Sequence, residues 1–198
     1  IKYTLIIPLK KNHLNQRAKR FESLVVMYSK QFDLDPAIIF ALIETESAFN
    51  PKAKSHIPAY GLMQLVPKSG ARDAYLYIYK KDKFLGKTYL YKPKNNIELG
   101  CAYLAKIRYV YFKDIKDDEK AFICSIPAYN TGIGNVSKTL SGTSILKNAS
   151  IVANDLATVE LYDKLVNDLK YKPVPPTIIG VFWLARHSLI FEITNCNH

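Results

Sequence analysis

Glycine, cysteine and acidic residues are scarce in this chain of 198 residues. It holds 8 glycines and 3 cysteines, and its 17 acidic residues face 28 lysines and arginines. With so few glycines and no repeat or low-complexity stretch, the sequence predicts a compact globular body. Cys101, Cys124 and Cys196 show no close pairing of a zinc or redox motif, and their odd number argues against a complete disulfide framework. We interpret the first two as buried free thiols.

Long apolar runs and cofactor motifs are also missing. Residues 178–191 are apolar but include Arg186 and His187, and they are shorter than the roughly 20 residues of a membrane-spanning helix. We find no metal-ligand cluster, phosphate loop or dinucleotide motif, so we expect no metal ion and no other cofactor. Because the chain begins at Ile1, we expect an N-terminal region to be missing, and membrane attachment is expected only through an anchor there.

Positive charge is the main excess, with a formal net charge of +11. A field of this size attracts polyanions to the protein surface. The basic residues are spread from Lys2 to Arg186, however, and no RNA- or DNA-binding motif accompanies them. We therefore predict that nucleic acid is not a partner, and that any binding to it would show steep salt dependence.

Apolar residues repeat at helical spacing along most of the chain, which predicts an all-α fold. Asp35 followed by Pro36 is typical of a helix start. Asn95 or Asn96 is expected to cap a second helix, and Asp117 or Asp118 to open a third, which Gly132 and Gly134 are expected to end near Asn130. The expected helices cover about residues 15–31, 36–47, 62–79, 95–107, 118–130 and 158–169. We expect three regions: an extended lead-in or linker from a missing N-terminal part (1–20), one main domain (21–172) and an atypical tail, Pro-rich and then apolar (173–198).

A glutamate occupies a position that periodicity assigns to the buried face of the expected helix 36–47. Ile39, Leu42, Ile43 and Glu46 follow the i, i+3, i+4, i+7 spacing of a buried stripe. Glu44, two residues earlier, lies about 200° away around the helix and is expected to face solvent. A carboxyl held against apolar side chains keeps its proton to higher pH, which suits a general acid. Periodicity alone leaves open that Glu46 lies at the fringe of the core or pairs with a basic residue.

Three short motifs follow one another along the chain. They are Glu46-Ser47-x-Phe49-Asn50-Pro51, Gly61-Leu62-Met63-Gln64 and Ala128-Tyr129-Asn130-Thr131-Gly132. With these motifs, residues 21–171 resemble the lytic transglycosylase domain of the soluble-lytic-transglycosylase type. The lead-in around residues 13–18 is similar to the membrane-bound murein transglycosylase C branch. The resemblance implies a lysozyme-like fold, as in goose-type lysozymes and lytic transglycosylases, in a single catalytic domain.

The same resemblance implies a reaction. Members of this family cleave the MurNAc–GlcNAc β-1,4 bond of peptidoglycan without water and leave 1,6-anhydroMurNAc ends. Glu46 is then the single catalytic acid and base, with a substrate N-acetyl group in place of the second carboxylate that most glycosidases use. Tyr129 is expected to hydrogen-bond this carboxyl, and Asn130 to hold an N-acetyl group. The residues implied to bind substrate are Ser47, Met63, Gln64, Tyr129 and Asn130.

The region after Tyr171 departs from the family pattern. Family members continue into a segment with a second active-site tyrosine, for which this tail offers no convincing equivalent. Two alternatives therefore stay open: a lysozyme-type hydrolase with Asp73 as its second carboxylate, and a non-catalytic module that binds peptidoglycan. The expected partners are peptidoglycan glycan strands, whose peptide carboxylates also suit the +11 charge. The expected location is periplasmic or outer-membrane-associated, facing the periplasm.

Overall fold

A computed structural model describes residues 13–169, and these residues form an all-α fold, as the sequence predicts. Its β-structure is limited to isolated bridges of Tyr60 with Lys54 and with Leu65. The lead-in before residue 13, the tail at 173–198 and Cys196 lie outside the described residues. The helices are α1 (His13–Lys19), α2 (Glu22–Gln31), α3 (Pro36–Ser47), α4 (Gly70–Tyr79), α5 (Lys87–Leu90), α6 (Pro93–Lys106), the π-helical turn η1 (Ile107–Tyr111), α7 (Asp118–Thr131), α8 (Ile133–Ser141), α9 (Leu146–Asp155) and α10 (Thr158–Asp168).

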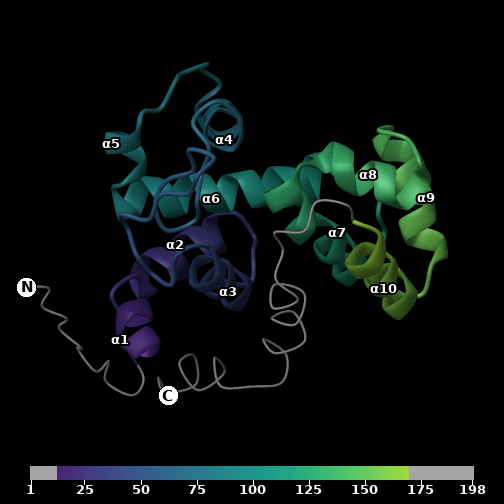
Figure 1. Cartoon of the computed structure of the whole chain (residues 1–198), viewed down its shortest axis with the longest axis horizontal. Helices are drawn as coiled ribbons and strands as arrows, with labels where there is room; N and C mark the ends of the chain where they lie inside the picture. The colour runs from purple at the N-terminus through teal and green to yellow at the C-terminus, as the bar shows by residue number, and fades with distance from the viewer. Residues whose placement is uncertain (1–12, 170–198) are drawn as a thin grey trace, which may run out of the picture.

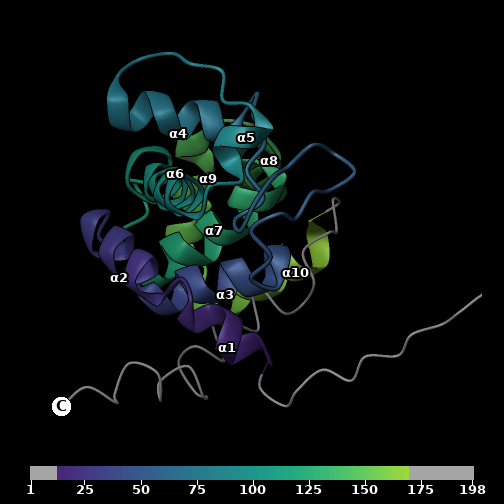
Figure 2. The ribbon, with the colours of Figure 1, turned by 90° about the vertical axis from the view of Figure 1, so that its left-hand side faces the viewer.

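Helix α6 lies at the centre of this arrangement. It packs against α4 on one side and α2 on the other, and Figure 2 shows it nearly end-on between α4 and the α2–α3 pair. Helices α7 to α10 pack together beyond the C-terminal end of α6 (Figure 1). The position of α6 follows from its composition, because apolar residues cover most of its circumference, and Ile97, Leu99 and Leu104 are fully buried.

Two helix starts match their sequence signals. The Asp35 carboxylate accepts a hydrogen bond from the Ala37 amide at 2.8 Å, and Pro36 occupies the first helical position of α3. Asp117 caps α7 in the same way, by accepting from the Lys120 amide at 2.9 Å. Each side chain satisfies a backbone donor that the first turn leaves without a helical partner.

Several predicted bounds were wrong. The expected helix 15–31 is two helices, α1 and α2, that meet at Arg20 and Phe21. Of the expected helix 62–79, only α4 is helical, because the residues before it form a looped segment closed by the bridges at Tyr60. The helix expected to be capped by Asn95 or Asn96 starts at Pro93, after Lys92.

Helices α8 and α9 were not predicted at all. Gly132, with φ of +92°, ends α7, but the chain turns directly into α8, which contains Gly134. A glycine with positive φ interrupts a helix at one residue and does not prevent a new helix from starting at the next. Gly132 therefore ends α7 close to the predicted place, and it marks a corner between two helices.

The core confirms the interpretation of two cysteines. Cys101 and Cys124 are fully buried free thiols, and burial raises the pKa of Cys124 to about 12. Among residues 13–169, no helix is long and apolar enough to cross a membrane.

Candidate active site

Helix α3 carries Glu46 in its last turn, at the edge of the core. Ile39 and Ile43 are fully buried on the same stripe, while Glu46 is partly buried and Glu44 is exposed, as the helical periodicity predicts. Ala48 and Phe49 follow with φ of +48° and +59°, which ends the helix and turns the chain away. The buried Phe49 ring packs against Phe40, with centroids 6.4 Å apart, and so holds this turn in place.

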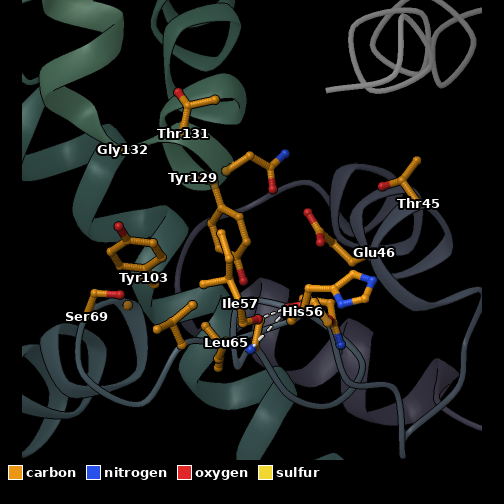
Figure 3. Close-up of a pocket in the computed structure, with 16 residues that line it drawn as sticks. Thr45, Glu46, His56, Ile57, Leu65, Ser69, Tyr103, Tyr129, Thr131 and Gly132 are labelled. Atoms are coloured by element: carbon orange, nitrogen blue, oxygen red, sulfur yellow. Dashed lines mark hydrogen bonds between the residues drawn. The ribbon is translucent and has the colours of Figure 1, made fainter. Parts of the chain in front are cut away.

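Glu46 lines a cavity of about 600 Å³. Its walls come from α3, from the segment between α3 and α4, from α6 and from the end of α7. Figure 3 shows Glu46 on one side of the cavity and Ser69 and Tyr103 on the other. The lining residues are Thr45, Glu46, Ser55, His56, Ile57, Ala59, Gln64, Leu65, Val66, Ser69, Gly70, Tyr103, Tyr129, Asn130, Thr131 and Gly132.

Glu46 is the one carboxylate among the described residues that line this cavity. Burial raises its pKa from 4.5 to about 7, because the apolar surroundings disfavour the charged form. No ion pair of Glu46 occurs within residues 13–169, so the alternative of pairing with a basic residue is not realised there. A carboxyl with a pKa near neutrality can both give up and take back a proton under physiological conditions.

The loop with Gly61-Leu62-Met63-Gln64 is held in place by hydrogen bonds to the Asn96 side chain of α6. The Asn96 side chain accepts from the Met63 amide at 2.7 Å and donates to the carbonyl oxygens of Tyr60 at 2.8 Å and Leu90 at 2.9 Å. Gly61 has φ of +81°, and a Cβ there would overlap the Asn96 side chain and the Leu90 oxygen. Glycine is therefore required where the loop crosses α6.

Tyr129 does not make the expected hydrogen bond to Glu46. Its buried hydroxyl donates to the carbonyl oxygen of Met63 at 2.8 Å, so it ties α7 to the glycine loop. Its ring lies beside that of Tyr103, with centroids 5.2 Å apart. Burial, with the nearby Glu46 as the next cause, raises the Tyr129 pKa well above its ordinary value, so the hydroxyl stays protonated.

The other predicted substrate-binding residues divide into two groups. Gln64 and Asn130 line the cavity together with Glu46 and Tyr129, and the Gln64 amide also donates to the Gly61 oxygen at 2.8 Å. Ser47 is not part of the lining, and its hydroxyl donates to the Ile43 oxygen one turn earlier at 3.0 Å. Met63 is fully buried beside Gly100 of α6, and it is not part of the lining.

Sequence reasoning missed five polar lining residues that lie outside the three motifs, Ser55, His56, Thr45, Ser69 and Tyr103. The first two lie between the first and second motifs, and this position was their only signal in the sequence. Tyr103 stands on α6 at a spacing that is equally typical of a core aromatic residue.

Asp73 lies outside the cavity that contains Glu46. Its carboxylate forms an ion pair with Lys106 and accepts from the Tyr111 hydroxyl at 3.1 Å. It is therefore not placed to activate water opposite Glu46. The described residues also contain no group of three or more His, Cys, Asp or Glu side chains that could hold a metal ion.

Residues 23–152 match the family model described as the transglycosylase SLT domain. The chain belongs to this family. The chain is 36% identical over 163 residues to membrane-bound lytic murein transglycosylase C of Klebsiella pneumoniae, covering 82% of this chain and 44% of the relative. The Cronobacter sakazakii protein of the same name is 35% identical over 168 residues, with 83% and 45% covered. The chain thus spans less than half the length of these curated relatives.

Solved structures agree with the SLT assignment. The 70 kDa soluble lytic transglycosylase of Escherichia coli superimposes with a TM-score of 0.53 at 26% identity, over 84% of this chain and 27% of that one. An inactive mutant of the Pseudomonas aeruginosa lytic transglycosylase Slt gives 0.51 at 27% identity, over 75% and 24%. The lysozyme-like fold predicted for this SLT domain is therefore confirmed.

Proposed function

We propose that this SLT domain is a peptidoglycan lytic transglycosylase that cleaves the MurNAc–GlcNAc β-1,4 bond and leaves 1,6-anhydroMurNAc ends. The observation that carries the proposal is Glu46, a lone carboxyl in a cavity of about 600 Å³ with its pKa raised to about 7 by burial. Family membership and the names of the relatives, lytic murein transglycosylases, support the same reaction class.

The reaction needs one group that acts twice. Protonated Glu46 donates to the glycosidic O4 as the C1–O4 bond breaks, and GlcNAc leaves with a free hydroxyl. The Glu46 carboxylate then takes the proton of the MurNAc 6-hydroxyl, whose oxygen bonds to C1 and closes the anhydro ring. The proton returns to Glu46, water is neither consumed nor released, and the carboxyl is ready for another turnover.

The positive charge that develops at C1 needs a partner. Most glycosidases supply a second carboxylate, but a substrate N-acetyl group can take its place. In the cavity, Gln64 and Asn130 carry amide groups that can both donate to and accept from an N-acetyl group. We assign these two side chains to holding the substrate amide near C1, while Tyr129 positions the loop that carries Gln64.

The products distinguish this reaction from hydrolysis. Purified peptidoglycan digested in heavy-oxygen water should release fragments with 1,6-anhydroMurNAc ends that contain no label and weigh one water less than hydrolytic products. Label at the new sugar end, found by mass spectrometry, would establish the lysozyme-type reaction. No release of fragments by the folded protein would leave only a binding role.

We further infer that the protein acts in the bacterial cell envelope. Its substrate, the glycan strands of peptidoglycan, lies there, and the curated relatives carry the description membrane-bound. Fractionation of the source cells, with the protein detected by antibody, tests this location, and recovery in the cytoplasmic fraction would contradict it.

A further inference from the structure

A second hollow adjoins the Glu46 cavity on its far side. It measures about 380 Å³, and its walls come from α4, from the segments on either side of α4, from α6 and from η1. Charged side chains supply half of its lining, unlike the cavity around Glu46. The lining residues are Lys68, Ser69, Arg72, Asp73, Leu76, Asp82, Tyr103 and Tyr111.

Ser69 and Tyr103 line both spaces, so the hollow continues the active-site cavity. These two residues stand on the side of the cavity opposite Glu46 (Figure 3). A polymer bound across the Glu46 cavity would therefore meet the charged hollow next. The hollow is not needed for the chemistry assigned to Glu46, which leaves its charges to be explained.

Both carboxylates of the hollow already have cationic partners. Asp73 pairs with Lys106, and Asp82 pairs with Arg72. Lys68 is exposed and has no hydrogen-bond or ion-pair partner among the described residues. Counting the Lys106 ammonium behind Asp73, the cations of the hollow outnumber its carboxylates by one, and the unmatched charge is that of Lys68.

The surroundings extend this positive field. Lys80, Lys81 and Lys83 flank Asp82 in the exposed segment after α4. Lys80 and Lys83 lie over tyrosine rings of α4, those of Tyr77 and Tyr75, and not beside carboxylates. An anionic group that enters the hollow thus meets the free ammonium group of Lys68, and the lysines next to Asp82 add to the positive field that attracts it.

We propose that this hollow binds a carboxylate of the peptide stem carried by the glycan strand, with Lys68 as the contact. The inference rests on the proposed function, because only a peptidoglycan strand would bring such a stem to this place. Every MurNAc unit can carry a stem, so a strand in the Glu46 cavity presents carboxylates nearby. The hollow would make the domain prefer strands with stems over bare glycan.

Binding by an inactive variant tests the hollow apart from the chemistry. In the full chain with Glu46→Gln, we would measure Kd by fluorescence anisotropy for soluble glycan strands with stems, and for the same strands after an amidase has removed the stems. Lys68→Gln should weaken binding of the stem-bearing strands about threefold and Lys68→Glu about tenfold, as expected for a solvent-accessible charge contact. Binding of bare strands should change less than about twofold, and added salt should diminish the difference.

Lys147 of α9 provides the matched control, because it is exposed and lines neither space. Lys147→Gln and Lys147→Glu change the net charge of the protein by the same amounts as the corresponding Lys68 variants. They should leave the preference for strands with stems intact. Equal weakening for bare and stem-bearing strands, an equal effect of the Lys147 variants, or no effect of Lys68→Glu would each overturn the proposal. The proposed function is judged separately, by the products that the wild-type protein releases.

Discussion

Replacing Glu46 with glutamine should make the protein more stable above neutral pH, while it removes the proton that the proposed reaction uses. Burial raises the Glu46 pKa from 4.5 to about 7, so the folded state binds this proton more tightly than the unfolded state does. The contribution of the bound proton to stability is therefore complete below about pH 4.5. It is lost as pH rises through about 7, where the folded protein must hold a buried charge.

The pKa difference sets the size of the effect. A pKa difference from 4.5 to about 7, at about 1.4 kcal/mol per unit of pKa, corresponds to roughly 3 kcal/mol between acid and alkaline conditions. Glutamine is neutral at every pH and keeps the shape of the side chain, so it avoids the cost of burying the charge. Glu46→Gln should therefore gain up to about 3 kcal/mol over wild type at pH 8 and almost nothing at pH 4.

Urea unfolding of the two proteins at pH 4 and pH 8, followed by circular dichroism, measures this difference. Glu44→Gln on the exposed face of α3 is the control, and should change the free energy of unfolding by less than about 0.5 kcal/mol at either pH. A glutamine variant no more stable than wild type at pH 8 would refute the reasoning. An equal gain at both pH values would do so too, because it would indicate better packing and not the removal of a charge.

Three further predictions concern activity and the loop beside Glu46. Glycan cleavage by Glu46→Gln should fall by roughly 10²-fold or more, and kcat/KM of wild type should decline as pH rises through about 7, because the acid must be protonated; a profile level from pH 5 to 9 would contradict this. Asn96→Ala should cost roughly 3 kcal/mol in urea unfolding, because the Met63 amide and the Leu90 oxygen lose the Asn96 side chain, and the Tyr60 oxygen keeps only its bond from the Leu65 amide. Tyr129→Phe should cost about 1 kcal/mol and lower kcat, since the Met63 oxygen loses its donor and the loop loosens; unchanged kcat would show that the hydroxyl does not position the site.

The elements with local signals were predictable from sequence. Asp35-Pro36 and Asp117 mark helix starts through side-chain caps, and the apolar stripe of α3 placed Glu46 at the core edge. These features depend on residues within two turns of one another. The corner at Gly132 and the looped segment before α4 depend instead on what the rest of the fold supplies, and there the predicted bounds were wrong.

Within the site, too, some features could be predicted from the sequence and others depend on the rest of the fold. The family resemblance implied roles at the site for Glu46, Gln64, Tyr129 and Asn130, and the structure places these four residues around one cavity. The partners of the hydroxyl groups could not be predicted, because they depend on distances of tenths of an ångström between remote segments. Tyr129 therefore binds the Met63 oxygen, although a bond to Glu46 was expected.

This difference changes the role of the tyrosine in the site. Asn96 of α6 holds the glycine loop from below, and Tyr129 of α7 holds it through the Met63 oxygen. The loop that carries Gln64 is thus fixed by two helices that do not contain the acid. Glu46 stands across the cavity on α3 with no ion-pair partner among the described residues, so its proton affinity is governed by burial. In the proposed reaction, Glu46 gives one proton and then recovers it. The absence of a hydrogen bond from Tyr129 suits this role, because such a bond would favour the charged form of Glu46 and lower the pKa that the proposed acid step requires.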